Sequence, residues 1–216
     1  MRQCAAVATI TGIAICKSLG GTATNVPLEA ADQAKETEWE FSFSSATYFS
    51  QHARDYENPN FTADHDWLHF EARYNYEAIK TGSVWLGYNF SAGKKLALEA
   101  TPMLGGVFGD ITGIAPGYTI SISYEPIEFF TQGEYFFDAG TRSGNFFYTW
   151  SELSYAPSRW FRVGVVIDRT KALGSNFDIR RGPLLGLKYK DVDFTTYWLS
   201  PGSSDSTFVF KVTLNF

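Results

Sequence analysis

From residue 39 to the end of the chain, apolar and polar side chains alternate almost one by one. The clearest runs place an apolar residue at every second position of Leu68–Tyr76, Tyr118–Tyr124, Phe161–Ile167 and Phe208–Phe216. A period of two sends successive side chains to opposite faces of a β-strand, whereas an amphipathic helix needs a period of 3.6. No segment after residue 38 shows a convincing helical period. The sequence therefore predicts an all-β fold.

The breaks between these runs alternate in length. Short breaks, such as Glu125–Pro126 and Lys190–Asp191, alternate along the chain with longer ones that are rich in Gly or Ser, such as Ala139–Gly144 and Pro201–Ser206. Short turns on one side and longer loops on the other are typical of an up-and-down barrel that crosses a membrane. A soluble sandwich with Greek-key connections gives no reason for such an alternation.

The strand count decides where the two ends of the chain lie. Ten strands can be placed between Leu68 and Phe216, and Trp39–Phe49 adds another. An odd number would leave the termini on opposite sides of a membrane, so a weak polar strand near Glu57–Ala63, turning at Asp64–Asp66, completes the set. We predict a single up-and-down antiparallel transmembrane β-barrel of twelve strands, with ten strands as the alternative.

Three segments interrupt the simple pattern. Apolar residues change phase after Trp150, which predicts a β-bulge near Ser151–Glu152. The glycines between Gly105 and Gly117 indicate a flexible loop or a kink in the barrel, because they lack the ending of a phosphate-binding loop. Leu184, Leu185 and Leu187 fall on both faces of their strand and leave its orientation open.

The polar face of the predicted strands carries charges, and its apolar face is aromatic near strand ends and aliphatic between them. This distribution fits a lipid-facing exterior around a polar lumen, whereas a soluble barrel would have to bury all the rings in one small core. Arg73 should find a carboxylate on a nearby strand, with Glu99 or Glu134 as the candidates. The residues expected to line the lumen are His69, Glu71, Arg73, Glu99, Glu134, Arg162, Asp168 and Lys211.

The N-terminal segment has the pattern of an export signal. An apolar stretch from Cys4 to Cys16 is too short to span a bilayer and is followed by small residues at Gly21 and Ala23. We expect a signal peptide at 1–23, a flexible lead-in at 24–37 and the barrel at 38–216. Both cysteines then lie in the signal, and the mature chain has no thiolate for metal or redox chemistry.

The last apolar run ends on Phe216. This ending resembles the terminal pattern by which Gram-negative outer-membrane barrels engage the barrel-assembly machinery. In addition, HFEARYNYEAIKTGSVWLGYNF (69–90), TPMLGGVFGDITGIAPG (101–117) and FFYTWSELSYAPSRWFRVG (146–164) resemble a family of uncharacterised, porin-like outer-membrane β-barrel proteins. The resemblance implies the fold and a location in the outer membrane of a bacterium, and it implies no activity.

Three functions are compatible with such a barrel: a narrow porin-like channel for small solutes, a closed structural or surface-interaction barrel, and a lipid-modifying enzyme. An enzyme is not expected, because no nucleophile is visibly placed beside His52, His65 or His69. No metal or other cofactor is expected. Outer-membrane lipid, the assembly machinery and a small solute are the expected partners. Nucleic acid is excluded by 18 Lys and Arg against 23 Asp and Glu, and the oligomeric state is left open.

Overall fold

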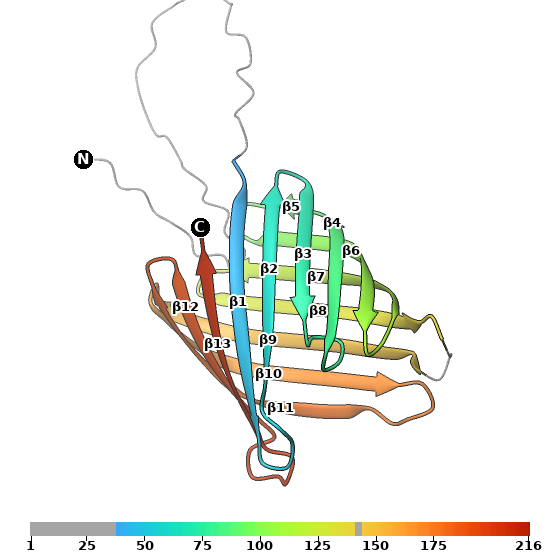
Figure 1. The fold of residues 1–216 in the computed structure, drawn as a ribbon. Coiled ribbons are helices and arrows are strands. Elements are labelled where there is room, and N and C mark those ends of the chain that lie inside the picture. The colour runs from blue at the N-terminus through green and yellow to red at the C-terminus, as the bar shows by residue number, and fades with distance from the viewer. Residues whose placement is uncertain (1–37, 141–143) are drawn as a thin grey trace, which may run out of the picture. The chain divides into compact units, whose positions relative to one another are not determined.

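The computed structural model describes residues 38–140 and 144–216. The predicted signal peptide and lead-in lie outside the described residues. The described part of the chain forms β-strands connected by turns and loops, and no α-helix occurs in it (Figure 1). The strands are β1 (Glu40–Ser50), β2 (Tyr56–His65), β3 (Leu68–Tyr74), β4 (Thr81–Tyr88), β5 (Phe90–Ala92), β6 (Ala97–Gly109), β7 (Gly113–Tyr124), β8 (Ile127–Asp138), β9 (Phe146–Ser158), β10 (Phe161–Ala172), β11 (Asp178–Tyr189), β12 (Val192–Leu199) and β13 (Thr207–Asn215).

The strands form one antiparallel sheet that closes on itself. The first strand, β1, pairs with the last, β13, and β4 pairs with β6 to complete the ring. The short β5 follows β4 after a break at Asn89 and pairs with the same neighbour, β6. The 13 strands therefore occupy twelve positions around the ring, which confirms the predicted barrel. The weak polar strand needed for an even number is present as β2.

Both described ends of the barrel chain lie at one end of the ring. The turns at this terminal end span residues 66–67, 93–96, 125–126, 159–160 and 190–191, and the opposite loop end carries the longer connections, such as 75–80 and 200–206 (Figure 1). The alternation of short and long breaks is thus a property of the fold. The connection between β6 and β7 is an exception, because it lies at the loop end and spans only residues 110–112.

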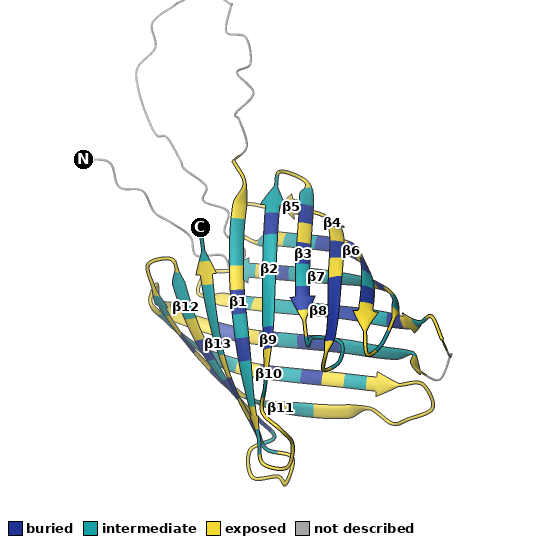
Figure 2. Ribbon diagram, viewed as in Figure 1, coloured by how far each residue is buried: buried dark blue, intermediate teal, exposed yellow. Residues whose placement is uncertain are grey.

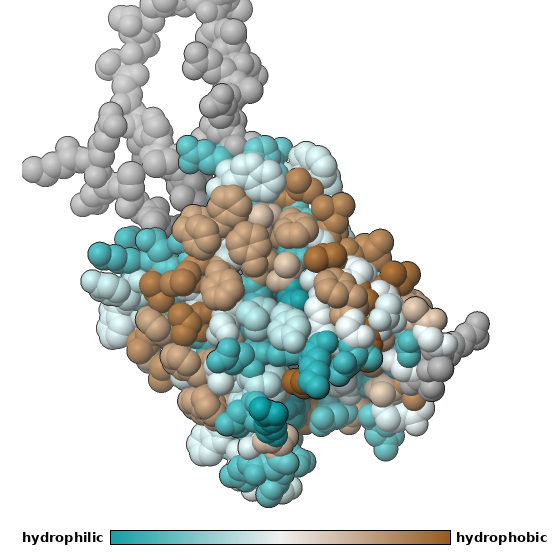
Figure 3. Space-filling model, in the orientation of Figure 1, coloured by the Kyte–Doolittle hydropathy of each residue, from teal (hydrophilic) through white to brown (hydrophobic). Residues whose placement is uncertain are grey.

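Burial alternates along the strands as their side chains point inward and outward (Figure 2). On β6, Thr101, Met103 and Val107 are buried, whereas Leu104 and Phe108 are 59% and 54% exposed. Large apolar side chains of this kind cover much of the outer face, and polar ones gather at the loop end (Figure 3). An apolar outer face on a closed ring is the surface that a barrel presents to lipid.

Among the described residues, no helix is long and apolar enough to cross a membrane.

The predicted bulge near Ser151–Glu152 is wrong. Strand β9 runs in unbroken register past these residues against both β8 and β10. The shift in register occurs instead where Tyr155 and Ser158 face β10. The apolar phase changes after Trp150 because that indole points into the barrel, where it is buried against other inward side chains.

Two other ambiguous segments acquire a definite structure. The glycines at 105–109 belong to strand β6 and not to a loop, so the alternative of a flexible loop is wrong. On β11, Leu184 is buried inside the barrel, whereas Leu185 and Leu187 are each 42% exposed on the outside. An interior that accepts apolar side chains explains why leucine occurs on both faces of this strand.

Candidate functional site

All eight residues predicted to line the lumen lie on the inward phase of their strands. Five of them, His69, Glu71, Arg73, Glu134 and Asp168, are buried. The other three, Glu99, Arg162 and Lys211, are partly exposed. These eight residues come from five strands, β3, β6, β8, β10 and β13, and further inward charges lie on β1, β2, β9, β11 and β12. The charged side chains that could form a functional site are therefore concentrated in the interior of the barrel.

Arg73 links two walls of the barrel. Its Nη1 donates to Glu134 Oε2 at 3.0 Å, and its Nη2 donates to Glu71 Oε2 at 2.7 Å. Strands β3 and β8, which carry Arg73 and Glu134, are separated around the ring by β4, β6 and β7. The bond therefore crosses the interior, and Glu134 is one of the two partners that the sequence suggested. A buried guanidinium with two carboxylates has the charge compensation that burial demands.

Aromatic rings hold the Arg73 guanidinium in place. Its Cζ lies 4.4 Å from the centre of the Tyr76 ring and 4.3 Å from that of Trp85. Trp85 can lie there because Gly105 and Gly117 have no side chains, and a Cβ built on Gly105 would be 2.5 Å from the indole. The glycine-rich segment thus provides room for a large ring inside the barrel. This contact was not visible in the sequence, because it depends on the pairing of β4 with β6.

Tyr76 is not the outward-facing strand residue that the alternation predicted. Strand β3 ends at Tyr74, and Asn75 has a φ of 57°, a left-handed conformation that asparagine tolerates. The chain therefore turns, and Tyr76 packs edge-on against Tyr148 at 5.5 Å between ring centres. The Gln132 amide donates to the Tyr76 hydroxyl at 2.6 Å. Burial raises the pKa of Tyr76 well above its ordinary value, so this loop hydroxyl stays protonated.

Carboxylates continue the network from Arg73 toward the terminal end. His69 Nδ1 lies 2.7 Å from Asp64 Oδ1, and its Nε2 lies 3.6 Å from Glu71 Oε2. Asn89, at the break between β4 and β5, donates to Asp64 Oδ1 at 2.7 Å and accepts from the Thr101 hydroxyl at 2.7 Å. A line of polar contacts thus connects β2, β3, β4 and β6 inside the barrel.

A second inward network surrounds Glu152. Its Oε1 accepts from Trp150 Nε1 at 2.7 Å and from the Tyr197 hydroxyl at 2.8 Å. Its Oε2 lies 3.6 Å from Arg162 Nη1, and Arg162 Nη2 also lies 3.3 Å from Asp193 Oδ1. Sequence reasoning missed Glu152 because it placed a bulge at this residue. The regular alternation of the neighbouring strands was the signal that could have found it.

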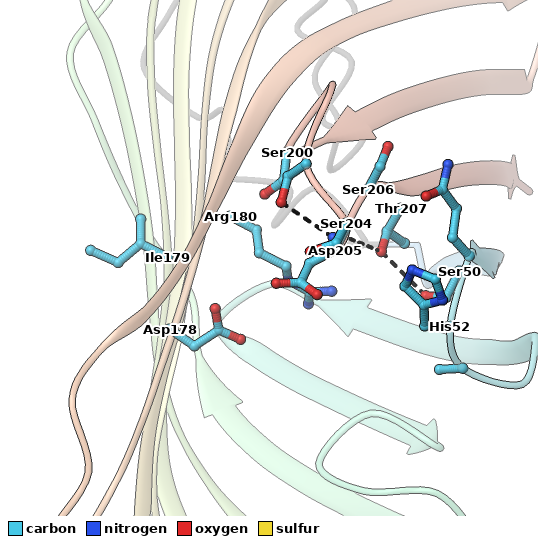
Figure 4. A pocket seen from close by; sticks show the side chains of 13 residues that line it. Ser50, His52, Asp178, Ile179, Arg180, Ser200, Ser204, Asp205, Ser206 and Thr207 are labelled. Atoms are coloured by element: carbon cyan, nitrogen blue, oxygen red, sulfur yellow. Dashed lines mark hydrogen bonds between the residues drawn. The ribbon is translucent and has the colours of Figure 1, made fainter.

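A polar pocket of about 350 Å³ lies at the loop end. It is formed where β1, β11 and β13 meet their loops, and Figure 4 shows His52, Arg180 and Asp205 around the same space. Ser50 and Thr207 join two of its walls through hydroxyls 3.2 Å apart. Arg180, on the wall toward the lumen, forms an ion pair with the predicted lumen residue Asp168. Nine side chains with hydrogen-bonding groups or charges line most of the remaining wall: Ser50, Gln51, His52, Asp178, Ser200, Ser203, Ser204, Asp205 and Ser206.

Three further polar side chains, those of Ser83, His52 and His65, lie in different environments. The Ser83 hydroxyl donates to Glu77 at 2.6 Å and accepts from Trp85 Nε1 at 2.9 Å. His52 lines the loop-end pocket, and the His65 ring lies 4.9 Å from that of Trp39. Within residues 38–140 and 144–216, no three His, Cys, Asp or Glu residues are grouped so that they could hold a metal ion.

Comparison with known proteins supports the architecture. The barrel is similar to the KdgM porin, with a TM-score of 0.56 and 10% identity over 81% of this chain and 99% of that one. It is also similar to the NanC porin, with a TM-score of 0.55 and 11% identity over 82% and 98% of the two chains. No family model matches the sequence, and no curated protein matches it. At such low identity the likeness shows the fold.

A closed antiparallel barrel with an apolar exterior and a charged interior is a transmembrane β-barrel. Its likeness to the KdgM and NanC porins shows that the fold is porin-like.

Replacing Arg73 should destabilise the barrel, because Glu71 and Glu134 would remain buried without their counter-charge. We expect Arg73→Ala to lower the free energy of unfolding by about 3–5 kcal/mol, measured by urea unfolding of the barrel in detergent micelles. The triple variant E71Q/R73M/E134Q removes all three charges and should recover much of the loss. Arg159→Ala, in an exposed turn, is the control. Equal stability of R73A and R159A would contradict the cross-lumen ion pair.

Adding one methyl group to a glycine of β6 should have different effects on its inward and outward faces. Gly105→Ala should displace Trp85 and cost about 1–3 kcal/mol through overpacking, because the new Cβ would lie 2.5 Å from the indole. Gly106→Ala is the matched control, since nothing lies within 4 Å of its Cβ position. Tryptophan fluorescence and urea unfolding report both effects. If the two variants had the same spectrum and stability, the packing of Trp85 against β6 would be wrong.

Proposed function

We propose that the protein is a narrow porin-like channel for small solutes in the outer membrane, with its constriction at the Arg73–Glu134 ion pair. The observation that supports this proposal is a set of inward-facing charges that extends from the loop end to the terminal end of the barrel. The loop-end pocket leads, through Arg180 and Asp168, to inward charges distributed along the strands. An inward-facing set of fixed charges is how narrow pores select solutes.

The charge balance of the interior favours cationic or neutral solutes over anionic ones. Inward-facing carboxylates outnumber inward-facing basic groups, and fixed negative charge in a low-dielectric passage repels anions. The KdgM porin has been solved in complex with oligogalacturonate, which bears carboxylates. We propose a different solute class for this barrel. The carboxylates are Glu40, Asp64, Glu71, Glu99, Glu128, Glu134, Asp138, Glu152, Asp168, Asp178 and Asp193, and the basic residues are Arg73, Arg162, Arg180, Lys188 and Lys211.

Planar-bilayer recording tests the channel and its constriction together. We expect small unit conductance from the wild type, larger steps from R73A/E134A, and a reversal potential in a KCl gradient that shows preference for K⁺. The double variant removes both side chains of the bridge that crosses the lumen. Arg159→Ala should behave as the wild type, because it lies in an exposed turn at the terminal end. If the conductance steps of R73A/E134A had the same size as those of the wild type, the constriction would lie elsewhere.

A closed structural barrel is the second candidate, and the packing of the interior favours it. The inward side chains of Trp85, Phe136 and Val166 are 1%, 0% and 0% exposed. In a closed barrel the charges would serve to stabilise the walls, and function would reside in loops at 139–144 and 171–178. Absence of conductance from both the wild type and R73A/E134A would favour this candidate. A lipid-modifying enzyme has no comparable support, because the Ser83 hydroxyl is bonded to Glu77 and Trp85.

We further propose that Phe216 is the residue that the assembly machinery recognises. Phe216 exchanges two backbone hydrogen bonds with Phe41, both of 2.9 Å, and the two rings stack at 5.9 Å. Its ring is 70% exposed, so it is accessible at the seam between β1 and β13.

Deleting Phe216 should lower the amount of folded barrel in cells several-fold, as seen by heat-modifiable gel mobility. Refolding of the purified chain into detergent should change little, because most of the β1–β13 seam remains. Phe210→Ala removes an outward aromatic from the same strand and is the control. If deletion impaired refolding in detergent as strongly as assembly in cells, Phe216 would serve stability and not recognition.

A further inference from the structure

Three basic side chains gather on the outer, lipid-facing surface of two adjacent strands. Arg169 and Lys171 lie on the outward phase of β10, and Arg181 lies on the outward phase of β11. All three are exposed. They are the basic residues on the outward phase of the described strands, since the other strand Arg and Lys residues point inward. The single outward carboxylate of those strands, Glu57, is on β2, which β1, β13 and β12 separate from β11.

The register places the three groups in one row on the outer face of the barrel. Arg169 faces Ile179 across the β10–β11 pair, and Ile167 faces Arg181. Arg169 and Arg181 are therefore diagonal neighbours on one face, with Cα atoms about 7 Å apart. Lys171 follows Arg169 by two residues, about 7 Å along the strand on the same face. The three cations thus form a slanting row with Arg169 in the middle, and the Cα atoms of Lys171 and Arg181 at its ends are about 14 Å apart (strands in Figure 1). We call this row the outer basic triad.

The triad has no opposite charge beside it among the residues that the structure describes. Within the described part of the chain, none of its three side chains forms a salt bridge, and Lys171 contacts only an aromatic face, with its Nζ 4.9 Å from the centre of the Phe177 ring. The outward neighbours on β9 are Phe147 and Thr149, which carry no charge. Three like charges held together on a surface that faces lipid are unfavourable unless an anion lies among them.

The position of the triad identifies the level of the membrane at which that anion lies. Exposed aromatic side chains adjoin it, Phe177 beside Lys171 and Trp198 on the neighbouring strand β12, and the Trp198 indole donates to Ser206 in the loop. Trp198 has one apolar and one polar end, and side chains of this kind mark the headgroup region of a bilayer. Short turns face the periplasm in such barrels, so the loop end with the triad faces the outer leaflet.

We propose that the outer basic triad binds the phosphate groups of a phosphorylated glycolipid of the outer leaflet. Two guanidinium groups can each form paired hydrogen bonds with phosphate oxygens, and the lysine adds a point charge. The flanking Phe177 and Trp198 pack against the adjoining acyl region. This site lies on the outside of the barrel and does not depend on the lumen being open.

Binding of lipid A to the purified barrel in a neutral detergent tests the proposal. Each basic side chain near a lipid phosphate contributes about 1 kcal/mol, so R169Q/K171Q/R181Q should bind bisphosphorylated lipid A about 100-fold more weakly than the wild type. Dephosphorylated lipid A should bind the wild type with a similar loss of affinity relative to bisphosphorylated lipid A. Native mass spectrometry measures the retained lipid, and heat-modifiable mobility shows that the variant is folded.

The matched control is K94Q/K95Q/K190Q, which removes the same charge from exposed turns at the terminal end. It should retain lipid A as the wild type does. Equal retention by wild type and R169Q/K171Q/R181Q would overturn the proposal, as would an equal loss in the control variant. Displacement of lipid A by an equimolar concentration of inorganic phosphate would assign the triad to free anions and overturn its assignment to lipid.

Discussion

The structure depends on the closure of its sheet. In hydrocarbon an unpaired backbone N–H or C=O costs several kcal/mol, so a sheet that faces lipid has to end where it begins. Pairing of β1 with β13 and of β4 with β6 satisfies this condition. Closure divides every strand into an inner and an outer face, and the alternation in the sequence follows from that division. The break at Asn89 is compatible with closure because β4 and β5 pair with the same strand.

The interior combines two kinds of side chain that rarely share a space. Charged groups such as Arg73 and Glu134 are buried among aromatic side chains. Each buried guanidinium or carboxylate therefore needs an oppositely charged neighbour inside the barrel. The aromatic rings reduce the space open to water, which strengthens the ion pairs. The same rings fix the side-chain positions, since Trp85 lies against Gly105 on one side and Arg73 on the other.

The fold was largely predictable, because period-two alternation and turn lengths depend on local sequence alone. The inward phase of the predicted lumen residues follows from the same periodicity. The contacts inside the barrel were harder to predict from the sequence, because they join strands that are distant in sequence. Trp150 and Tyr76 illustrate the limit: aromatic residues were taken as outward, yet these two point inward. Glu152 was missed for the same reason, whereas Arg73 and Glu134 were matched on charge alone.

The bridge between β3 and β8 has a mechanical consequence. A thin-walled cylinder of this kind resists stretching along its strands but flattens easily, since neighbouring strands can pivot about their hydrogen bonds. Arg73 connects β3 to β8, four positions away around the ring, through Glu134, and its guanidinium lies between the rings of Tyr76 and Trp85. It therefore acts as a strut that keeps the cross-section from becoming elliptical under the lateral pressure of the bilayer. The ring is then supported from within, by one side chain that reaches across part of its interior.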